Sequence, residues 1–247
     1  MKTFILLGLV FLLSNFGKAQ LTNDYPFKTF LDSVNNLYVT GNDFNIESNS
    51  LDITYEKYNQ SGEILDFKFY LNSFGNDRGM DIEVDKFGNS YLTGFIYNSI
   101  TQSNDIIFLK YNNSGNLVMD SVYNSPGDDK GYAIEISKDN LGIVNSIFIS
   151  GYKTDVIYGQ KMFVKKIGLF SETSWTREIP ASGKYSVATD IKVDAGFVYV
   201  CGYGYMGPEN GDDIIMVTLD RQTGEVVENG MLVHNIAGSN ERPTAFS

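Results

Sequence analysis

One short pattern recurs four times along this chain of 247 residues. In each copy a strand-like segment ends in a small residue followed by glycine. The intervals between copies are 53, 57 and 51 residues, and the final glycines are Gly41, Gly94, Gly151 and Gly202. A second phrase, KYN-x-SG, ends at Gly62 and again 53 residues later at Gly115. A period near 50 residues built from strand signals is typical of repeat architectures, and it favours a β-propeller.

The second copy shows what one repeat predicts. Residues 79–85 alternate apolar and acidic side chains, which is the period of a strand. Three further strands are predicted at 90–97, 105–112 and 116–123, separated by turns that contain Gly88 and Gly115. Four antiparallel strands joined in this way make one propeller blade. We predict an all-β fold whose blades cover approximately 25–75, 76–127, 128–183 and 184–238, followed by a stub at 239–247.

The number of repeats does not fill an ordinary ring. Residues 239–247 align with the opening of the second copy, so they indicate the start of a fifth blade. Propellers take about four to eight blades, and seven blades of this period need roughly 370 residues. We expect an incomplete ring that belongs to a longer protein. The alternative is a closed four-bladed ring in which the stub overlaps the first blade.

The first 19 residues have the pattern of a secretory signal peptide. Lys2 gives a positive start, residues 4–16 form an apolar run, and Gly17 and Ala19 are the small residues of a cleavage site. The alternative is a buried N-terminal strand or helix. No later segment approaches 18 unbroken apolar residues, so we expect no transmembrane segment. The predicted location is extracellular or on the cell surface, with the periplasm also open.

Charge and rare residues exclude several classes of function. The formal net charge is −11, which argues against nucleic acid or an anionic lipid surface as a partner. The single cysteine, Cys201, takes the place of Thr40, Thr93 and Ser150 in the other copies, so it reads as a small buried side chain. The single histidine, His234, has no second histidine for a zinc site. We expect no catalytic residues and no cofactor.

The amino-acid sequence of the repeats resembles that of a known family. The phrases VDKFGNSYLTG, FLKYNNSG and SFGNDRGMDIEVD are similar to the SBBP repeats of secreted bacterial proteins, which form seven-bladed β-propellers. The resemblance covers essentially all of residues 25–247. It implies an exported propeller at the cell exterior or envelope. The family has no common catalytic residues, so the resemblance implies none here.

We expect a ligand site on the rim where the second and third strands of each blade are joined. These connections read as long loops at 42–51, 98–104, 153–160 and 204–212, and long loops on a rigid scaffold favour binding. Three residues past the repeat glycines are Phe44, Tyr97 and Tyr205, with Thr154 in the third copy. Aromatic side chains there suit stacking on sugar or peptide ligands. The alternative is that they only pack between blades.

Acidic residues on the same rim raise the question of a metal. Asp105, Asp212, Asp213 and Glu209 offer oxygen ligands for calcium. No D-x-D-x-D-G loop with its closing glutamate is present, and aspartate is common where a turn enters a strand. We therefore expect no metal site, and we keep Asp105 and Asp213 as candidate ligand-binding residues.

Two classes of function remain open. The first is a scaffold or binding module that engages an extracellular protein or glycan, since no nucleophile and base are grouped in the sequence. The alternative is an extracellular polysaccharide hydrolase or lyase, which needs clustered carboxylates. Asp81 and Asp190 align between copies, but Lys28 and Ala133 fill that place in the other two.

Overall fold

The computed structural model describes residues 25–72, 75–155, 157–179, 185–205, 211–234 and 242–243. The predicted signal peptide at 1–19, Glu209 and most of the stub at 239–247 lie outside this part of the chain. The described part is all-β: it contains sixteen strands and no helix. No helix within it is long and apolar enough to cross a membrane.

The sixteen strands form four antiparallel sheets of four strands, each sheet in chain order. The first sheet consists of β1 (Tyr25–Leu31), β2 (Leu37–Asn45), β3 (Ser50–Tyr58) and β4 (Ile64–Tyr70). The second consists of β5 (Arg78–Val84), β6 (Ser90–Asn98), β7 (Ser103–Tyr111) and β8 (Leu117–Tyr123). The third sheet consists of β9 (Lys130–Lys138), β10 (Val144–Asp155), β11 (Gly159–Gly168) and β12 (Trp175–Ile179). The fourth consists of β13 (Ser186–Val193), β14 (Phe197–Tyr205), β15 (Asp212–Asp220) and β16 (Val226–His234). Each sheet lies within one predicted repeat, so the repeating four-stranded unit is confirmed.

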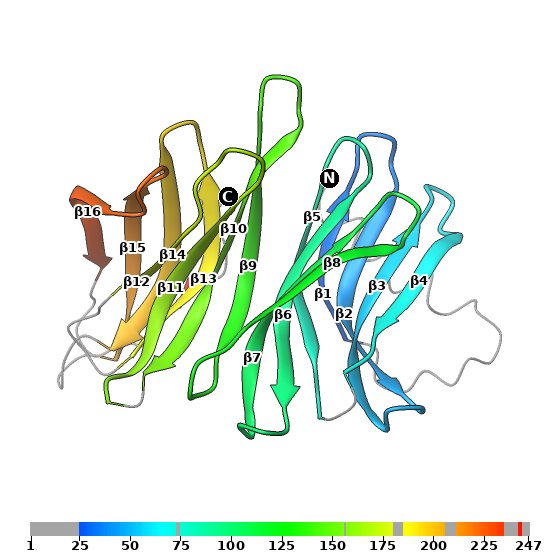
Figure 1. The fold of residues 1–247 in the computed structure, drawn as a ribbon, viewed down its shortest axis with the longest axis horizontal. Helices are drawn as coiled ribbons and strands as arrows, with labels where there is room; N and C mark the ends of the chain where they lie inside the picture. The colour runs from blue at the N-terminus through cyan, green and yellow to red at the C-terminus, as the bar shows by residue number, and fades with distance from the viewer. Residues whose placement is uncertain are drawn as a thin grey trace.

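The sheets stand side by side in chain order, from β1–β4 on the right of Figure 1 to β13–β16 on the left. Three apolar clusters fill the spaces between them. The first joins Tyr38 and Tyr55 of the first sheet to Leu109 of the second. The second joins Phe108 to Phe163 of the third sheet, and the last joins the third sheet to the fourth. Both faces of an inner sheet are therefore buried, and the core is divided among the junctions between sheets.

Each sheet has an inner and an outer edge. The first strands contact one another in sequence: β1 lies against β5, β5 against β9, and β9 against β13. The fourth strands β4, β8 and β16 are mostly half-buried or exposed. The first strands thus line the inner side of the assembly, and the fourth strands form its periphery.

The same irregularity occurs in every inner strand. The pairing between first and second strands shifts by one residue between Pro26 and Lys28, and at the equivalent places in the other three sheets. Such a β-bulge bends the strand and brings its backbone close to the second strand. A Cβ atom on Gly94 would lie 1.9 Å from the carbonyl oxygen of Arg78, and one on Gly151 would lie 1.9 Å from that of Lys130. The repeated glycine is therefore required by a bulge within its own sheet.

Close approach between neighbouring sheets occurs at other glycines, which lie on the first strands. A Cβ on Gly79 would lie 2.1 Å from Thr40 Oγ1 of the preceding sheet, and one on Gly131 would lie 2.5 Å from Thr93 Oγ1. In the first and second sheets the small residue before the repeat glycine thus faces a glycine of the next first strand. Cys201 occupies this place in the fourth sheet and is buried, as predicted.

The expected long loops at 42–51, 98–104 and 153–160 are wrong. β2 and β3 continue pairing through Phe44↔Leu51 and Asn45↔Ser50, which leaves only residues 46–49 as the turn. The ladders of the second and third sheets extend in the same way. Asn49 and Gln102 adopt positive φ of 54° and 55°, which closes tight turns without glycine. The polar composition of these segments reflects their place on the rim, since backbone pairing does not need apolar side chains. Much of the fourth connection, 204–212, lies outside the described residues.

Candidate functional site

Directly after its bulge, the first strand of each sheet carries one residue at an equivalent place on the inner side of the assembly. These residues are Lys28, Asp81, Ala133 and Asp190. Asp81 is 4% exposed, and its carboxylate bridges two sheets. Its Oδ1 accepts from the backbone N–H of Ile82 at 2.9 Å, and its Oδ2 accepts from that of Ile134 in the third sheet at 2.8 Å. Asp81 therefore fastens the second sheet to the third.

Two residues further along, the inner strands carry a second layer of charge. Glu83, Glu135 and Lys192 belong to β5, β9 and β13, and Lys192 Nζ lies 2.8 Å from Glu135 Oε2. In the first layer Lys28 Nζ lies 3.7 Å from Asp81 Oδ1. We call these six residues the inner-strand cluster: Lys28, Asp81, Glu83, Glu135, Asp190 and Lys192. The lysine side chains are about half exposed, at 48% and 51%, so solvent reaches the cluster.

Two carboxyl groups of the cluster, those of Glu83 and Asp81, have a raised pKa. Burial raises the pKa of Glu83 to about 8, and the negative charges of Glu135 and Asp81 add to the rise. Burial also raises the pKa of Asp81 to about 6, with Lys28 opposing the shift and Asp190 reinforcing it. At neutral pH Glu83 thus keeps its proton while Asp81 is mostly ionised. This combination offers both hydrogen-bond donors and acceptors, and it is also what acid–base chemistry requires.

The cluster brings together the two acids that the sequence aligned. Asp81 and Asp190 lie close enough for their charges to interact, although β9 separates their strands. Ala133 occupies the equivalent position on β9 between them. Glu83, Glu135 and Lys192 were not among the predicted site residues. Their alternation with apolar residues on a strand was visible, but their convergence depends on how different sheets stack.

The three aromatic candidates lie at equivalent places in three different sheets. Phe44 is the last residue but one of β2 and is exposed. The ring of Tyr97 packs against Gly75, because a Cβ there would lie 2.4 Å from the ring. Tyr205 stacks on Tyr185, with ring centroids 6.3 Å apart. Each contact involves residues next to its own sheet, so the structure gathers no common aromatic surface from these side chains.

Asp105 and Asp213 are each 1% exposed, which withdraws them from solvent. Asp105 accepts from Asn98 Nδ2 at 2.7 Å, and its other oxygen has no partner in the described part of the chain. The second and fourth sheets, which carry these two acids, are separated by the third. Among the residues that the structure describes, no three His, Cys, Asp or Glu side chains form a group that could hold a metal ion.

A repeated contact that the sequence analysis missed fastens one sheet to the next. The backbone N–H of Asp77 donates to Leu51 O of the first sheet at 2.7 Å, and Asp77 Oδ1 accepts from the backbone N–H of Tyr97 at 2.7 Å. Asp129 repeats the arrangement with Asn104 O and the N–H of Thr154, both at 2.8 Å. The signal was present in the phrases GNDRG and GDDKG before each first strand.

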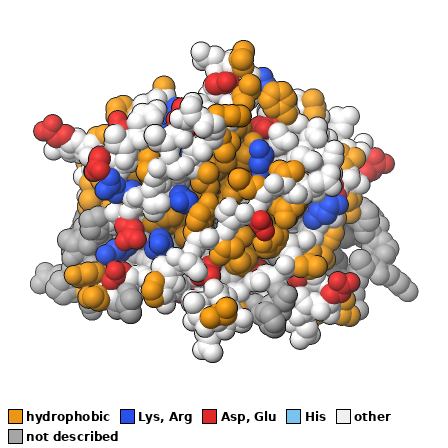
Figure 2. All heavy atoms as spheres, viewed as in Figure 1, with side chains coloured by type: hydrophobic (Ala, Val, Ile, Leu, Met, Phe, Trp, Pro, Cys, Tyr) orange, Lys and Arg blue, Asp and Glu red, His pale blue; other side chains and the backbone are white. Residues whose placement is uncertain are grey.

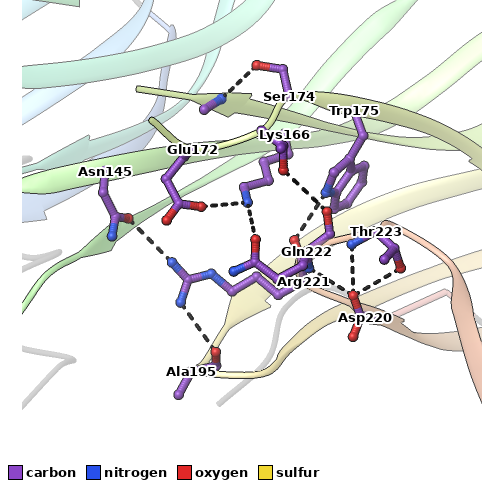
Figure 3. A network of polar contacts seen from close by, with 12 residues as sticks. Asn145, Lys166, Glu172, Ser174, Trp175, Ala195, Asp220, Arg221, Gln222 and Thr223 are labelled. Carbon is purple, nitrogen blue, oxygen red and sulfur yellow. Dashed lines mark hydrogen bonds and ion pairs between the residues drawn. The ribbon is translucent and has the colours of Figure 1, made fainter. Parts of the chain in front are cut away.

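A polar network joins the hairpin between β11 and β12 to the hairpin between β15 and β16 (Figure 3). The buried Lys166 donates to Glu172 at 3.0 Å and to Gln222 at 3.4 Å. Arg221 reaches Asn145 and the backbone of Ala195. Every partner belongs to the third or fourth sheet, so the network acts as a clamp between these two sheets.

A groove opens at the periphery between the first and second sheets. It has a volume of about 420 Å³, and its walls come from β4 and from the hairpin of β7 and β8. The lining combines aromatic, apolar and polar side chains: Lys68, Phe69, Tyr70, Leu71, Tyr111, Asn116, Leu117 and Asp120, with Gly115. Figure 2 shows apolar side chains gathered across the middle of the face that β8 crosses in Figure 1, and several residues of β8 are exposed and apolar.

Comparisons with known proteins leave the family open. No protein family matches the chain, and no curated protein matches it. Among solved structures it is similar to Pyrococcus horikoshii acylaminoacyl peptidase at 14% identity, with a TM-score of 0.37. That match covers 82% of this chain, and it spans 38% of the peptidase chain.

Proposed function

We propose that this chain is part of a β-propeller of the SBBP-like type, secreted or held at the cell surface, that acts as a binding module for a protein or glycan. Its sheets would be blades around a common axis, with the inner-strand cluster facing that axis. The proposed cellular location rests on the signal-peptide pattern of residues 1–19. The proposed repeat type rests on the sequence resemblance of the four copies to SBBP repeats.

The observation that carries the proposal is the inner-strand cluster. It joins four carboxyl groups and two ammonium groups from four different strands, and backbone contacts fix Asp81 within it. Rigid donors and acceptors that solvent can reach suit a polar ligand, because the site loses little conformational entropy on binding. A strongly basic ligand or a simple anion would match only part of this mixed charge.

The test is a binding screen of the intact protein against glycan and peptide arrays. We expect a saturable ligand whose affinity falls in Glu83→Ala and in Lys192→Ala. The matched control is Glu178→Ala, which removes an exposed carboxylate from the outer strand β12. Binding that none of the three substitutions alters would remove the inner-strand cluster as the site.

The second candidate is an extracellular polysaccharide hydrolase or lyase. It is favoured by the raised pKa of Glu83 beside ionised carboxylates, since glycoside hydrolysis uses one protonated and one ionised carboxyl group. Product analysis after incubation with polysaccharides separates the two functions. Released oligosaccharides that disappear with Glu83→Gln would establish the enzyme, whereas binding without turnover supports the binding module.

A further inference from the structure

The groove between the first and second sheets has the size and lining of a small-molecule site. Its volume of about 420 Å³ falls within the range of about 300–1,000 Å³ that such sites have. It lies at the outer edge of the sheets, on fourth strands, whereas the inner-strand cluster lies on first strands. The two places are therefore separate surfaces of the same molecule.

We infer that this groove binds an uncharged carbohydrate. The inference deepens the proposed function and rests on it, since it names a ligand class for a second surface of the binding module. The first reason is aromatic: Tyr70 of β4 and Tyr111 of β7 both line the groove, and Tyr111 is 3% exposed. Tyr111 is held rigid by stacking on Tyr55, with ring centroids 4.6 Å apart and planes 9° apart. The buried Tyr111 thus backs the groove rigidly, and the half-buried ring of Tyr70 is the surface that suits the apolar C–H face of a sugar ring.

The second reason is the polar group at the mouth of the groove. The Tyr70 hydroxyl donates to Asp120 Oδ2 at 3.0 Å, which joins the first sheet to the second across the opening. Burial raises the pKa of Tyr70 to about 12, and the contact with Asp120 adds to the rise. The Asn116 side chain offers an amide donor and acceptor beside them. Sugar hydroxyls both donate and accept hydrogen bonds, so they match this set.

The third reason is the negative charge of the groove, which favours an uncharged ligand over an acidic one. The one cation among the lining residues, Lys68, is engaged with Asp66 Oδ1 at 2.5 Å. Asp66 itself points at the Gly115 turn, because a Cβ on Gly115 would lie 1.3 Å from Asp66 Oδ2. Asp66 and Asp120 leave the groove negative, as is the chain as a whole at −11. An acidic glycan would be repelled.

The next junction offers a matched comparison. Tyr123 ends β8 as Tyr70 ends β4, and both pair with the equivalent residue of the third strand. The place of Asp120, opposite Leu109 of β7, is taken in the third sheet by Thr176, opposite Lys165. The second junction thus keeps the tyrosine but lacks the carboxylate. Tyr123→Ala is therefore the control for Tyr70→Ala.

The experiment is calorimetric titration of the intact protein with neutral tetrasaccharides of β-1,4-linked glucose and of β-1,4-linked N-acetylglucosamine, and with tetragalacturonate as the acidic probe. We expect one neutral probe to bind and the acidic probe not to bind. Tyr70→Ala and Asp120→Asn should each weaken binding by about tenfold, and Tyr123→Ala should not. Tyr70→Phe keeps the ring, so it should lose less than Tyr70→Ala. Melting temperatures confirm that each variant is folded.

The outcomes separate this inference from the proposed function. If a neutral probe binds equally well to the wild type, Tyr70→Ala and Asp120→Asn, the groove is not the site, although the chain remains a binding module. Preference for tetragalacturonate overturns the ligand class. No heat from either neutral probe overturns the inference, whereas array ligands that depend on Glu83 and Lys192 would still support the proposed function.

Discussion

At the scale of single residues, the repeat glycine shows how close packing is encoded. An alanine Cβ at Gly151 would lie 1.9 Å from Lys130 O, a backbone atom that cannot turn aside. We expect Gly151→Ala to lower the free energy of unfolding by about 3 kcal/mol or more, which places it among the severe substitutions. Urea denaturation measures the change. The control is Gly196→Ala, where a Cβ has no neighbour within 4 Å, and we expect a change within about 0.5 kcal/mol. Equal losses in the two variants would contradict this explanation.

Lys166 tests what a buried charge contributes. Its side chain is fully buried, paired with Glu172, and placed 6.0 Å from the centroid of the Phe148 ring. Truncation in Lys166→Ala removes both the ion pair and the packing, so we expect a loss of about 3 kcal/mol in urea denaturation. Lys166→Met keeps the length of the side chain and removes the desolvated charge. It should recover at least half of that loss.

The exposed Lys138 provides the control for this pair of variants, and Lys138→Ala should change the free energy of unfolding by less than about 0.5 kcal/mol. A methionine variant as unstable as the alanine variant would show that the ion pair itself, and not the apolar stem, stabilises the clamp.

The sequence predicts the burial of a residue best when the neighbours of that residue belong to its own sheet. The small buried Cys201 and the tight glycines follow from comparing copies. Asp81 reads as part of the polar face of an alternating strand, yet it is 4% exposed. The reason is that the neighbouring sheet covers the second face as well. A pattern within one strand does not show what covers its polar side, and so it predicts Glu83 as a surface residue as readily as a site residue.

At the scale of elements, the strands are predicted to within about two residues wherever apolar alternation and turn glycines mark them. Residues 90–97 and 116–123, for example, become β6 and β8 with shifts of one residue. The hairpin tips were misjudged because the strands continue into polar sequence. Aspartates support the opposite turns: Asp32 and Asp85 each accept two backbone N–H groups. These local hydrogen bonds fix the turns without any apolar signal.

The buried carboxyl groups at the junctions make stability depend on pH. Burial raises the pKa of Asp77 to about 7 from 3.8, and that of Glu83 to about 8 from 4.5. The folded protein therefore keeps protons that the unfolded chain releases, and this stabilisation is lost as the pH rises through 7 and 8. Turn aspartates such as Asp194 have a lowered pKa, so their contribution is lost as the pH falls below about 4. We expect maximal stability near pH 5 and a decline that levels off above about pH 8.

The variant that tests this pH dependence is Asp77→Asn. Asparagine keeps the acceptor for the backbone N–H of Tyr97 but does not ionise, so the decline between pH 5 and pH 8 should become shallower. Asp194→Asn is the control, because its titration lies below this window. Urea denaturation at each pH gives the slopes. A slope unchanged in Asp77→Asn would assign the decline to other groups.

At the scale of the whole molecule, stability is distributed along a row of sheets. Within the described residues each apolar cluster is shared by two neighbouring sheets, and none there spans three. Such an arrangement behaves as a sum of unit stabilities and nearest-neighbour interfaces. The repeat period predicted this from the sequence, because four equal copies have to bury their faces on one another. The angle between sheets depends on side chains at the junctions, so the period alone does not predict the angle at which neighbouring sheets meet.

The position of a destabilised sheet in the row should therefore decide how far the damage extends. In Gly202→Ala the new Cβ would lie 2.0 Å from Val187 O, and the fourth sheet shares a cluster with the third alone in the described structure. Hydrogen exchange should show loss of protection in β13–β16, a smaller loss in β10 and β11, and none in β1–β3. Gly94→Ala places the same clash in the second sheet, which shares clusters on both sides. Its effect should reach the first and third sheets together. Uniform loss of protection in both variants would mean that the four sheets unfold as one cooperative unit.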